Sequence, residues 1–207
     1  DGSVVTWGNS SYGGDSASVA SSLTSGITQI YSSQRAFAAV KTDGSVVTWG
    51  DMYHGGDSYS VSNSLTSGVT QIYSNKKAFA ALKTDGSVVT WGTHNSGGDS
   101  SSVASSLTSG VTQIYSNKEA FAALKTDGSV VTWGDMYHGG DSYSVASSLT
   151  SGVTQIYSNK EAFAALKTDG SVVTWGKNSF GGDSSSVASS LTSGVTQIFS
   201  TLEGAFS

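Results

Sequence analysis

The chain has 207 residues, a formal net charge of −5, 26 glycines and neither cysteine nor proline. Its acidic balance argues against a nucleic-acid partner, because such proteins usually carry a basic stripe, and no apolar run is long enough for membrane insertion as a helix. Without cysteine there is no disulfide framework, thiolate nucleophile or cysteine-ligated zinc. Because the chain starts with Asp1 rather than Met, we expect a processed product or an excised piece.

An internal repeat determines the expected architecture. The string DGSVVTWG begins at Asp1 and returns every 42 residues. The five units span 1–42, 43–84, 85–126, 127–168 and 169–207. A period of about 40–45 residues is typical of propeller blades or paired helices. We expect one domain covering 1–207.

Strand-like runs follow one another along each unit. After the opening segment 1–24, they are Ile27–Ser32, Ala36–Thr42, Gly44–Gly50 and the weaker Tyr59–Leu65. They are short and rich in β-branched and aromatic residues, and Asp-Gly between the second and third is a hairpin signal. Glycine and serine density opposes helices. The pattern predicts an all-β fold with four-stranded antiparallel blades over 27–66, 69–108, 111–150 and 153–192.

The two ends of the chain suggest how a fifth blade could form. The chain begins with the third and fourth runs of a blade and ends with the first run and a shortened second. Joining 195–207 to 1–24 would close a five-bladed β-propeller and remove its exposed sheet edges. Near-identical blades could instead exchange between chains, giving a homo-oligomer rather than a monomer. A β-solenoid is the competing fold, although it would need shorter coils.

Three strings in each unit carry a family resemblance. In the third and fourth units they are Val111–Ile114 (VTQI), Ala120–Leu124 (AFAAL) and Asp127–Gly134 (DGSVVTWG). Together they resemble the RCC1-like β-propeller repeat, in the form of bacterial arrays, and the resemblance covers all five units. It implies four-stranded blades around an axis. The unit is shorter than usual, Gly-Gly-Asp-Ser replaces Gly-Gln-Leu-Gly, and the loops and basic features linked to nucleotide exchange and chromatin binding are missing. Only the fold is carried over.

The differences between repeats gather in two loops. One follows Trp-Gly and covers 9–12, 51–54, 93–96, 135–138 and 177–180; the other links the first two runs and covers 33–35, 75–77, 117–119, 159–161 and 201–204. In an antiparallel meander both loops lie at the same end of a blade. We call this end the loop face. Variable loops on a constant scaffold are typical of binding modules, although unconstrained drift would give the same variation.

Aromatic, histidine and aspartate side chains of this face are the candidate ligand-binding residues. They are Tyr12, Asp51, Tyr53, His54, Tyr59, His94, Asp135, Tyr137, His138, Tyr143 and Phe180. An aromatic platform with a few convergent polar groups suits a sugar. The alternative is that the loop aromatics pack on their own blade.

Other recurring residues have structural explanations. The tryptophan of every DGSVVTWG string is expected in the core. The aspartate after each Gly-Gly offers too few oxygens for calcium and is expected to cap its turn. His54, His94 and His138 would need three loops to converge on a metal ion, so we expect no metal site. No catalytic motif or cofactor motif is present, and we expect no enzyme activity and no cofactor.

Three functional hypotheses remain. The first is a multivalent binding module for a carbohydrate or cell-surface ligand, since repetition multiplies weak contacts. The second is a structural spacer of a larger surface protein, and either of these two favours an extracellular or cell-surface location. The third is an engineered symmetric scaffold, which the 12 % of charged residues argues against, because designed surfaces carry roughly 25–35 %.

Overall fold

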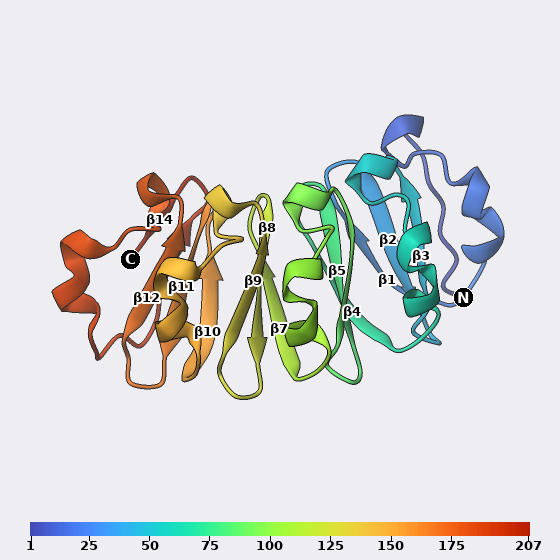
Figure 1. Ribbon diagram of the computed structural model, residues 1–207. Helices are drawn as coiled ribbons and strands as arrows, with labels where there is room; N and C mark the ends of the chain where they lie inside the picture. The colour runs from blue at the N-terminus through green and yellow to red at the C-terminus, as the bar shows by residue number, and fades with distance from the viewer. The chain divides into compact units, whose positions relative to one another are not determined.

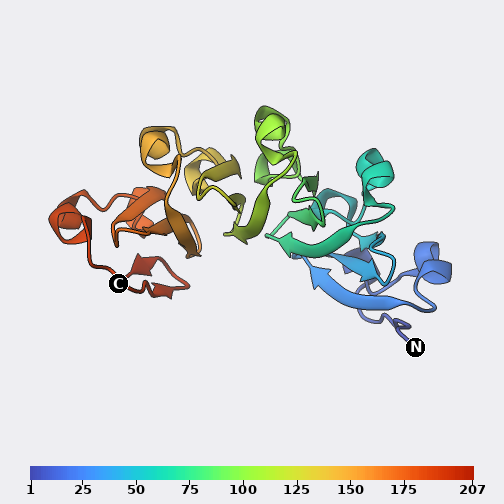
Figure 2. The ribbon, with the colours of Figure 1, turned by 90° about the horizontal axis from the view of Figure 1, so that it is seen from below.

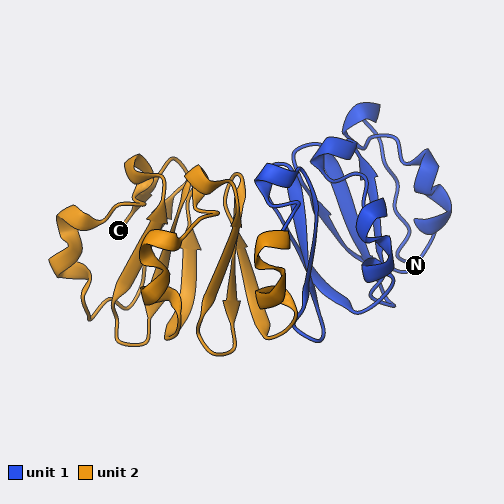
Figure 3. Ribbon diagram, in the orientation of Figure 1, with its two compact units in different colours: residues 1–100 blue, residues 101–207 orange.

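The computed structural model describes residues 1–207 as antiparallel sheets joined by 3-10 helices (Figure 1). The chain divides into unit 1, Asp1–Ser100, and unit 2, Ser101–Ser207 (Figure 3). The antiparallel sheets confirm the all-β expectation. That the five repeats form one domain stays a prediction.

Four sheets have three strands each, and one has two. In unit 1 they are β1 (Ile27–Ser32), β2 (Ala36–Lys41) and β3 (Val46–Gly50), then β4 (Val69–Ser74), β5 (Ala78–Lys83) and β6 (Val88–Gly92). In unit 2 they are β7 (Val111–Ser116), β8 (Ala120–Lys125) and β9 (Val130–Gly134), then β10 (Val153–Ser158), β11 (Ala162–Lys167) and β12 (Val172–Gly176), and finally β13 (Ser200–Thr201) with β14 (Ala205–Phe206).

Each three-stranded sheet is a meander held by the same local contacts. In the first, Phe37 lies opposite Trp49 and their rings stack with centroids 5.3 Å apart. The Asp-Gly turn between β2 and β3 is closed by Asp43, whose Oδ1 accepts from the backbone N of Ser45 at 2.9 Å and from its Oγ at 2.6 Å. The hairpin predicted there is therefore confirmed.

The fourth run of each repeat forms a 3-10 helix, so the expectation of four-stranded blades is not met by the sheets. Asp57 Oδ1 accepts from the backbone N of Tyr59 at 2.8 Å and starts the helix that replaces the expected strand. The longer helices are η2 (Ala17–Ser22), η4 (Tyr59–Leu65), η6 (Ser101–Leu107), η8 (Tyr143–Leu149) and η10 (Ser185–Leu191). The three-residue helices are η1 (Ser10–Tyr12), η3 (Met52–His54), η5 (His94–Ser96), η7 (Met136–His138) and η9 (Asn178–Phe180). None of these helices could cross a membrane.

Consecutive sheets within a unit pack face to face. In unit 1 one face of β2 meets the next sheet, and η4 lies beside β6 (Figure 2). This apolar layer contains Ala36, Ala38, Val40, Leu65, Val69, Ile72, Phe79, Ala81 and Trp91, all buried. The small alanines of β2 permit the two sheets to approach closely, and Leu65 of η4 packs into the same layer. Close packing of this kind makes a core sensitive to the loss of any large side chain.

Neither chain end forms a complete three-stranded sheet. β13 and β14 pair only with each other, and residues 1–9 contain no strand. Instead, Val4 and Val19 pack on the first sheet beside Leu23 and Trp49. That 195–207 and 1–24 together make a fifth blade stays a prediction.

Candidate functional site

The two variable loops of a repeat lie at the same end of its sheet, as predicted for the loop face. The backbone N of Asp51, after β3, donates to Arg35 O between β1 and β2 at 2.9 Å. Ser33 Oγ donates to His54 O at 2.7 Å. These hydrogen bonds connect the two variable loops, so a substitution in either loop alters the loop face.

The loop after β3 is a capped single turn. Asp51 Oδ1 accepts from the backbone N of Tyr53 at 2.8 Å and lies 3.0 Å from His54 Nδ1. The His54 contact holds the pKa of the Asp51 carboxyl below its ordinary value. Gly55 ends the turn at φ +92°, and a Cβ there would lie 2.5 Å from the Phe79 ring. Only glycine fits this position without strain.

The second variable loop is held by a buried amide in most repeats. Asn159 Oδ1 accepts from the backbone N of Ala162 at 2.9 Å and from that of Glu161 at 3.1 Å, and its Nδ2 donates to Phe180 O at 2.8 Å. Asn75 and Asn117 do the same in their own repeats. These asparagines keep the loop backbone in place while the neighbouring side chains vary.

The structure separates the candidate residues into two groups. His54 and His138 are largely buried against Asp51 and Asp135; the His138 Nδ1 to Asp135 Oδ1 distance is 2.7 Å. The tyrosines, in contrast, project into solvent. Their exposed fractions are 72 % for Tyr53, 85 % for Tyr59, 72 % for Tyr137 and 88 % for Tyr143.

The remaining candidates belong to neither group. Tyr12 lies under the Arg35 guanidinium, 4.7 Å from its ring centroid, and Phe180 lies under the Lys177 ammonium at 4.8 Å. His94 is exposed and its Nε2 is 2.8 Å from Asp99 Oδ2. Both aromatic rings therefore carry a cation on one face.

A groove on the loop face of unit 2 brings some of the predicted residues together. It has a volume of about 670 Å³ and is lined by Met136, Tyr137, His138, Gly176, Lys177, Asn178 and Ser179. The corresponding place in unit 1 is different, because Thr93 replaces Lys177 and its hydroxyl donates to the carbonyl of Tyr53. The groove combines an exposed ring with an ammonium, an amide and a hydroxyl.

A charge network that the sequence did not indicate lies beside this groove. The buried carboxylate of Glu161 accepts from Lys177 Nζ, and lies 3.7 Å from Lys118 Nζ and 3.9 Å from His138 Nε2. The Lys177 hydrogen bond is the main reason that the pKa of Glu161 is lowered. The variability of position 161 was the only signal in the sequence, where Arg35 and Lys77 occupy the same place in earlier repeats.

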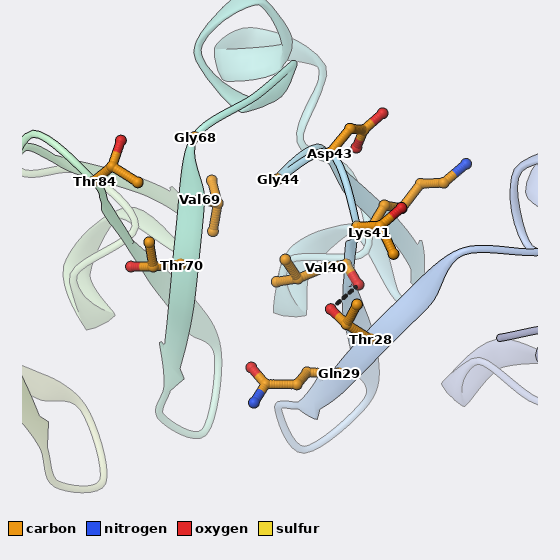
Figure 4. Close-up of a pocket in the computed structure, with 11 residues that line it drawn as sticks. Thr28, Gln29, Val40, Lys41, Asp43, Gly44, Gly68, Val69, Thr70 and Thr84 are labelled. Atoms are coloured by element: carbon orange, nitrogen blue, oxygen red, sulfur yellow. Dashed lines mark hydrogen bonds between the residues drawn. The ribbon is translucent and has the colours of Figure 1, made fainter.

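A second hollow lies at the opposite end of the sheets, in unit 1 (Figure 4). It measures about 510 Å³ and includes Thr28, Gln29, Val40 and Val69 in its lining. Thr28 Oγ1 donates to Val40 O at 3.0 Å, and the Lys41 side chain extends away from the hollow (Figure 4). The lining residues are nearly constant between repeats, and Thr70 Oγ1 likewise donates to Leu82 O on the neighbouring strand, so this end belongs to the constant scaffold.

No cluster of three or more His, Asp or Glu side chains is arranged to hold a metal ion. The aspartate after Gly-Gly caps a turn instead, as Asp183 shows: its Oδ1 accepts from the backbone N of Ser185 at 2.9 Å. The tryptophans of the four intact sheets are buried, as expected, whereas Trp7 is exposed.

Comparison with known proteins identifies the fold. No family model matches the chain, and no curated protein matches it. Yeast RCC1 (Prp20), in a structure with bound Kap60, is 18 % identical with a TM-score of 0.52 over 75 % of this chain and 44 % of that chain. Prp20p from Saccharomyces cerevisiae is 18 % identical, with a TM-score of 0.51 over 75 % of this chain and 45 % of that chain. Human WBSCR16 is 21 % identical, with a TM-score of 0.51 over 72 % of this chain and 47 % of that chain. The chain spans less than half the length of these proteins, and its fold is that of RCC1-like β-propellers.

Proposed function

We propose that the chain is a non-catalytic binding module whose loop face recognises a carbohydrate or another repetitive surface ligand. The groove containing Tyr137, His138 and Lys177 carries the proposal. An exposed tyrosine ring offers a platform for the apolar face of a sugar, while Lys177, Asn178 and Ser179 offer groups that hydrogen-bond to hydroxyls. The loop with Tyr53 repeats the aromatic element in unit 1, which suits a multivalent ligand.

A glycan array with the labelled chain tests this function. We expect binding to a set of related glycans and its loss in Tyr137→Ala, whose exposed ring contributes little to stability. Gln155→Ala, an exposed change on β10 outside the loop face, is the matched control and should bind as the wild type does. A flat array, or equal binding by both variants, would contradict the proposal.

A protein ligand is the second candidate. Met52 and Met136 flank the exposed tyrosines and are themselves 58 % exposed, and Met and Tyr are both enriched in protein interfaces. The yeast RCC1 structures are described with protein partners, namely Kap60, Gsp1p and histones. A flat glycan array together with Tyr137-dependent capture of one defined protein would favour this candidate. A flat array with no captured protein would favour a structural spacer.

A further inference from the structure

Each intact sheet contains one stacked phenylalanine–tryptophan pair. The pairs are Phe37–Trp49, Phe79–Trp91, Phe121–Trp133 and Phe163–Trp175, with ring centroids 5.2–5.4 Å apart. Two residues at the same repeat positions have no such partner. Phe206 lies in β14, and Trp7 lies in the segment 3–8 with 83 % of its surface exposed.

The C-terminal side of unit 2 is shaped to receive a tryptophan. Phe206 lies against Gly181, as Phe79 lies against Gly55 in an intact repeat. Beside it is an apolar cavity of about 370 Å³, lined among others by Ala164, Val187, Leu191 and Ile198. In the intact layer of unit 1, the equivalent space is filled by Val89 and Trp91.

The segment 3–8 offers the two missing side chains. Val5 and Trp7 occupy the repeat positions of Val89 and Trp91, and they are 78 % and 83 % exposed. The segment is already held in place, since Val4 N donates to Leu23 O at 2.9 Å and Thr6 Oγ1 lies 2.8 Å from Ser16 Oγ. Large apolar side chains that are exposed close together mark interaction sites, and Val5 and Trp7 are only two residues apart.

We propose that segment 3–8 of one copy adds to β14 of a second copy as the third strand of a shared blade. The register of the intact sheets, where Phe37 pairs with Trp49, places Phe206 opposite Trp7, Ser207 opposite Thr6 and Ala205 opposite Gly8. Trp7 Nε1 then donates to Gly181 O, as Trp175 Nε1 donates to Gly139 O. The two surfaces differ, so the contact is head-to-tail.

The length of the chain favours a second copy as the partner. The matched part covers 44–47 % of the RCC1-like chains, so the matched parts of two copies would together cover about nine-tenths of one such chain. In unit 2, β13 and β14 form a sheet of only two strands, and in unit 1 segment 3–8 has no strand assignment. The proposal is independent of what the loop face binds.

Site-directed cross-linking tests the register, because the chain has no cysteine of its own. Thr6→Cys chains and ¹⁵N-labelled Ser207→Cys chains are mixed and oxidised. Because only one of the two variants is labelled, mass spectrometry distinguishes the mixed dimer from either homodimer. Facing residues in antiparallel strands have Cβ atoms about 4.5–5.5 Å apart, so a small adjustment permits a disulfide. We expect the mixed dimer to dominate, and the pair Ser3→Cys with Ser207→Cys, displaced by about 10 Å, to give little. Equal yields from both pairs would overturn the proposal, as would a double variant, T6C/S207C, that closes only on itself in dilute solution.

Sedimentation velocity tests the contact without a covalent bond. We expect association that increases with concentration, and a loss of affinity of at least about tenfold in Trp7→Ala, because buried tryptophans dominate interface energies. Tyr59→Ala, another exposed aromatic, is the matched control and should associate like the wild type. A wild-type chain that stays monomeric at all concentrations, or equal weakening by both variants, would overturn the proposal.

Discussion

At the scale of single residues, one amino acid takes different roles in identical sequence contexts. Trp175 is buried, stacks on Phe163 and donates from Nε1 to Gly139 O, whereas Trp7 has the same flanking sequence and is exposed. The neighbouring strands, rather than the local sequence, therefore decide how much each tryptophan contributes to stability. This difference gives a comparison within one chain.

We predict that Trp175→Ala lowers the free energy of unfolding by about 3–5 kcal/mol, the usual loss for a large buried aromatic. Trp7→Ala should change it by less than about 0.5 kcal/mol, as for exposed positions, in dilute solution. Urea unfolding followed by far-UV circular dichroism measures both. Equal losses would show that Trp7 is buried in the isolated chain.

The aspartates of the Asp-Gly turns make the fold sensitive to acid. Ser87 Oγ donates to Asp85 Oδ1 at 2.6 Å, and this bond, followed by the Ser87 backbone NH, lowers the pKa of Asp85 from 3.8. Because the folded state binds the proton less readily than the unfolded state, this group stabilises the fold above pH 3.8. The contribution is lost as the pH falls through the lowered pKa of Asp85.

We predict that Ser87→Ala raises the pKa of Asp85 towards 3.8, because it removes the largest cause of the shift. A carboxyl-carbon NMR titration measures this change. Asp43, whose own partner Ser45 is untouched, is the internal control and should not move. An unchanged pKa of Asp85 would mean that the hydroxyl bond is not formed in solution.

At the scale of elements, a side-chain hydrogen bond that recurs between repeats holds the variable loops in place. Asn159 joins the loop after β10 to the carbonyl of Phe180 in the next variable loop. Ser33 occupies the same position in the first repeat, and it donates to the carbonyl of His54, which holds the repeat position of Phe180. The chain therefore provides its own conservative substitute for the asparagine.

We predict that Asn159→Ala costs about 1–3 kcal/mol of stability, because buried backbone groups lose their hydrogen-bond partners. Asn159→Ser should cost clearly less, since serine performs this task at position 33. Urea unfolding gives the stability, and hydrogen exchange of 177–180 reports whether the adjacent loop loosens. Two variants with the same cost would show that Asn159 acts only by filling space.

Short-range sequence patterns predict the strands and turns of a repeat better than its Ser-rich run. The second strand was expected at Ala36–Thr42 and is found at Ala36–Lys41, because alternation and the Asp-Gly turn are local signals. The run Tyr59–Leu65 was expected as a strand and is a 3-10 helix. Its apolar residues, Val61 and Leu65, lie four apart, and its serines bond readily to nearby backbone, which favours turns. The Glu161 network could not be predicted, because its partners Lys118 and Lys177 come from other repeats.

At the scale of the whole molecule, repetition places similar side chains on separate sheets. Tyr53 and Tyr137 have the same flanking residues and the same exposure of 72 %. Their surroundings differ, since Lys177 lines the groove beside Tyr137 and Thr93 bonds to the backbone of Tyr53. Under the proposed function, two such sites would bind a monovalent sugar independently, whereas a polymer that reached both would gain from its effective concentration.

We therefore predict different outcomes for monovalent and polymeric forms of the same glycan. Tyr53→Ala should leave binding of the monovalent form at the Tyr137 groove within about twofold of the wild type, while avidity for the polymer falls by about 10²-fold or more. Surface plasmon resonance with both ligand forms measures the two effects, and Gln155→Ala again provides the control. If Tyr53→Ala weakened both forms equally, the two tyrosines would belong to one site. If it weakened neither, the Tyr137 groove would act alone and the repeated aromatic loop would have no part in recognition.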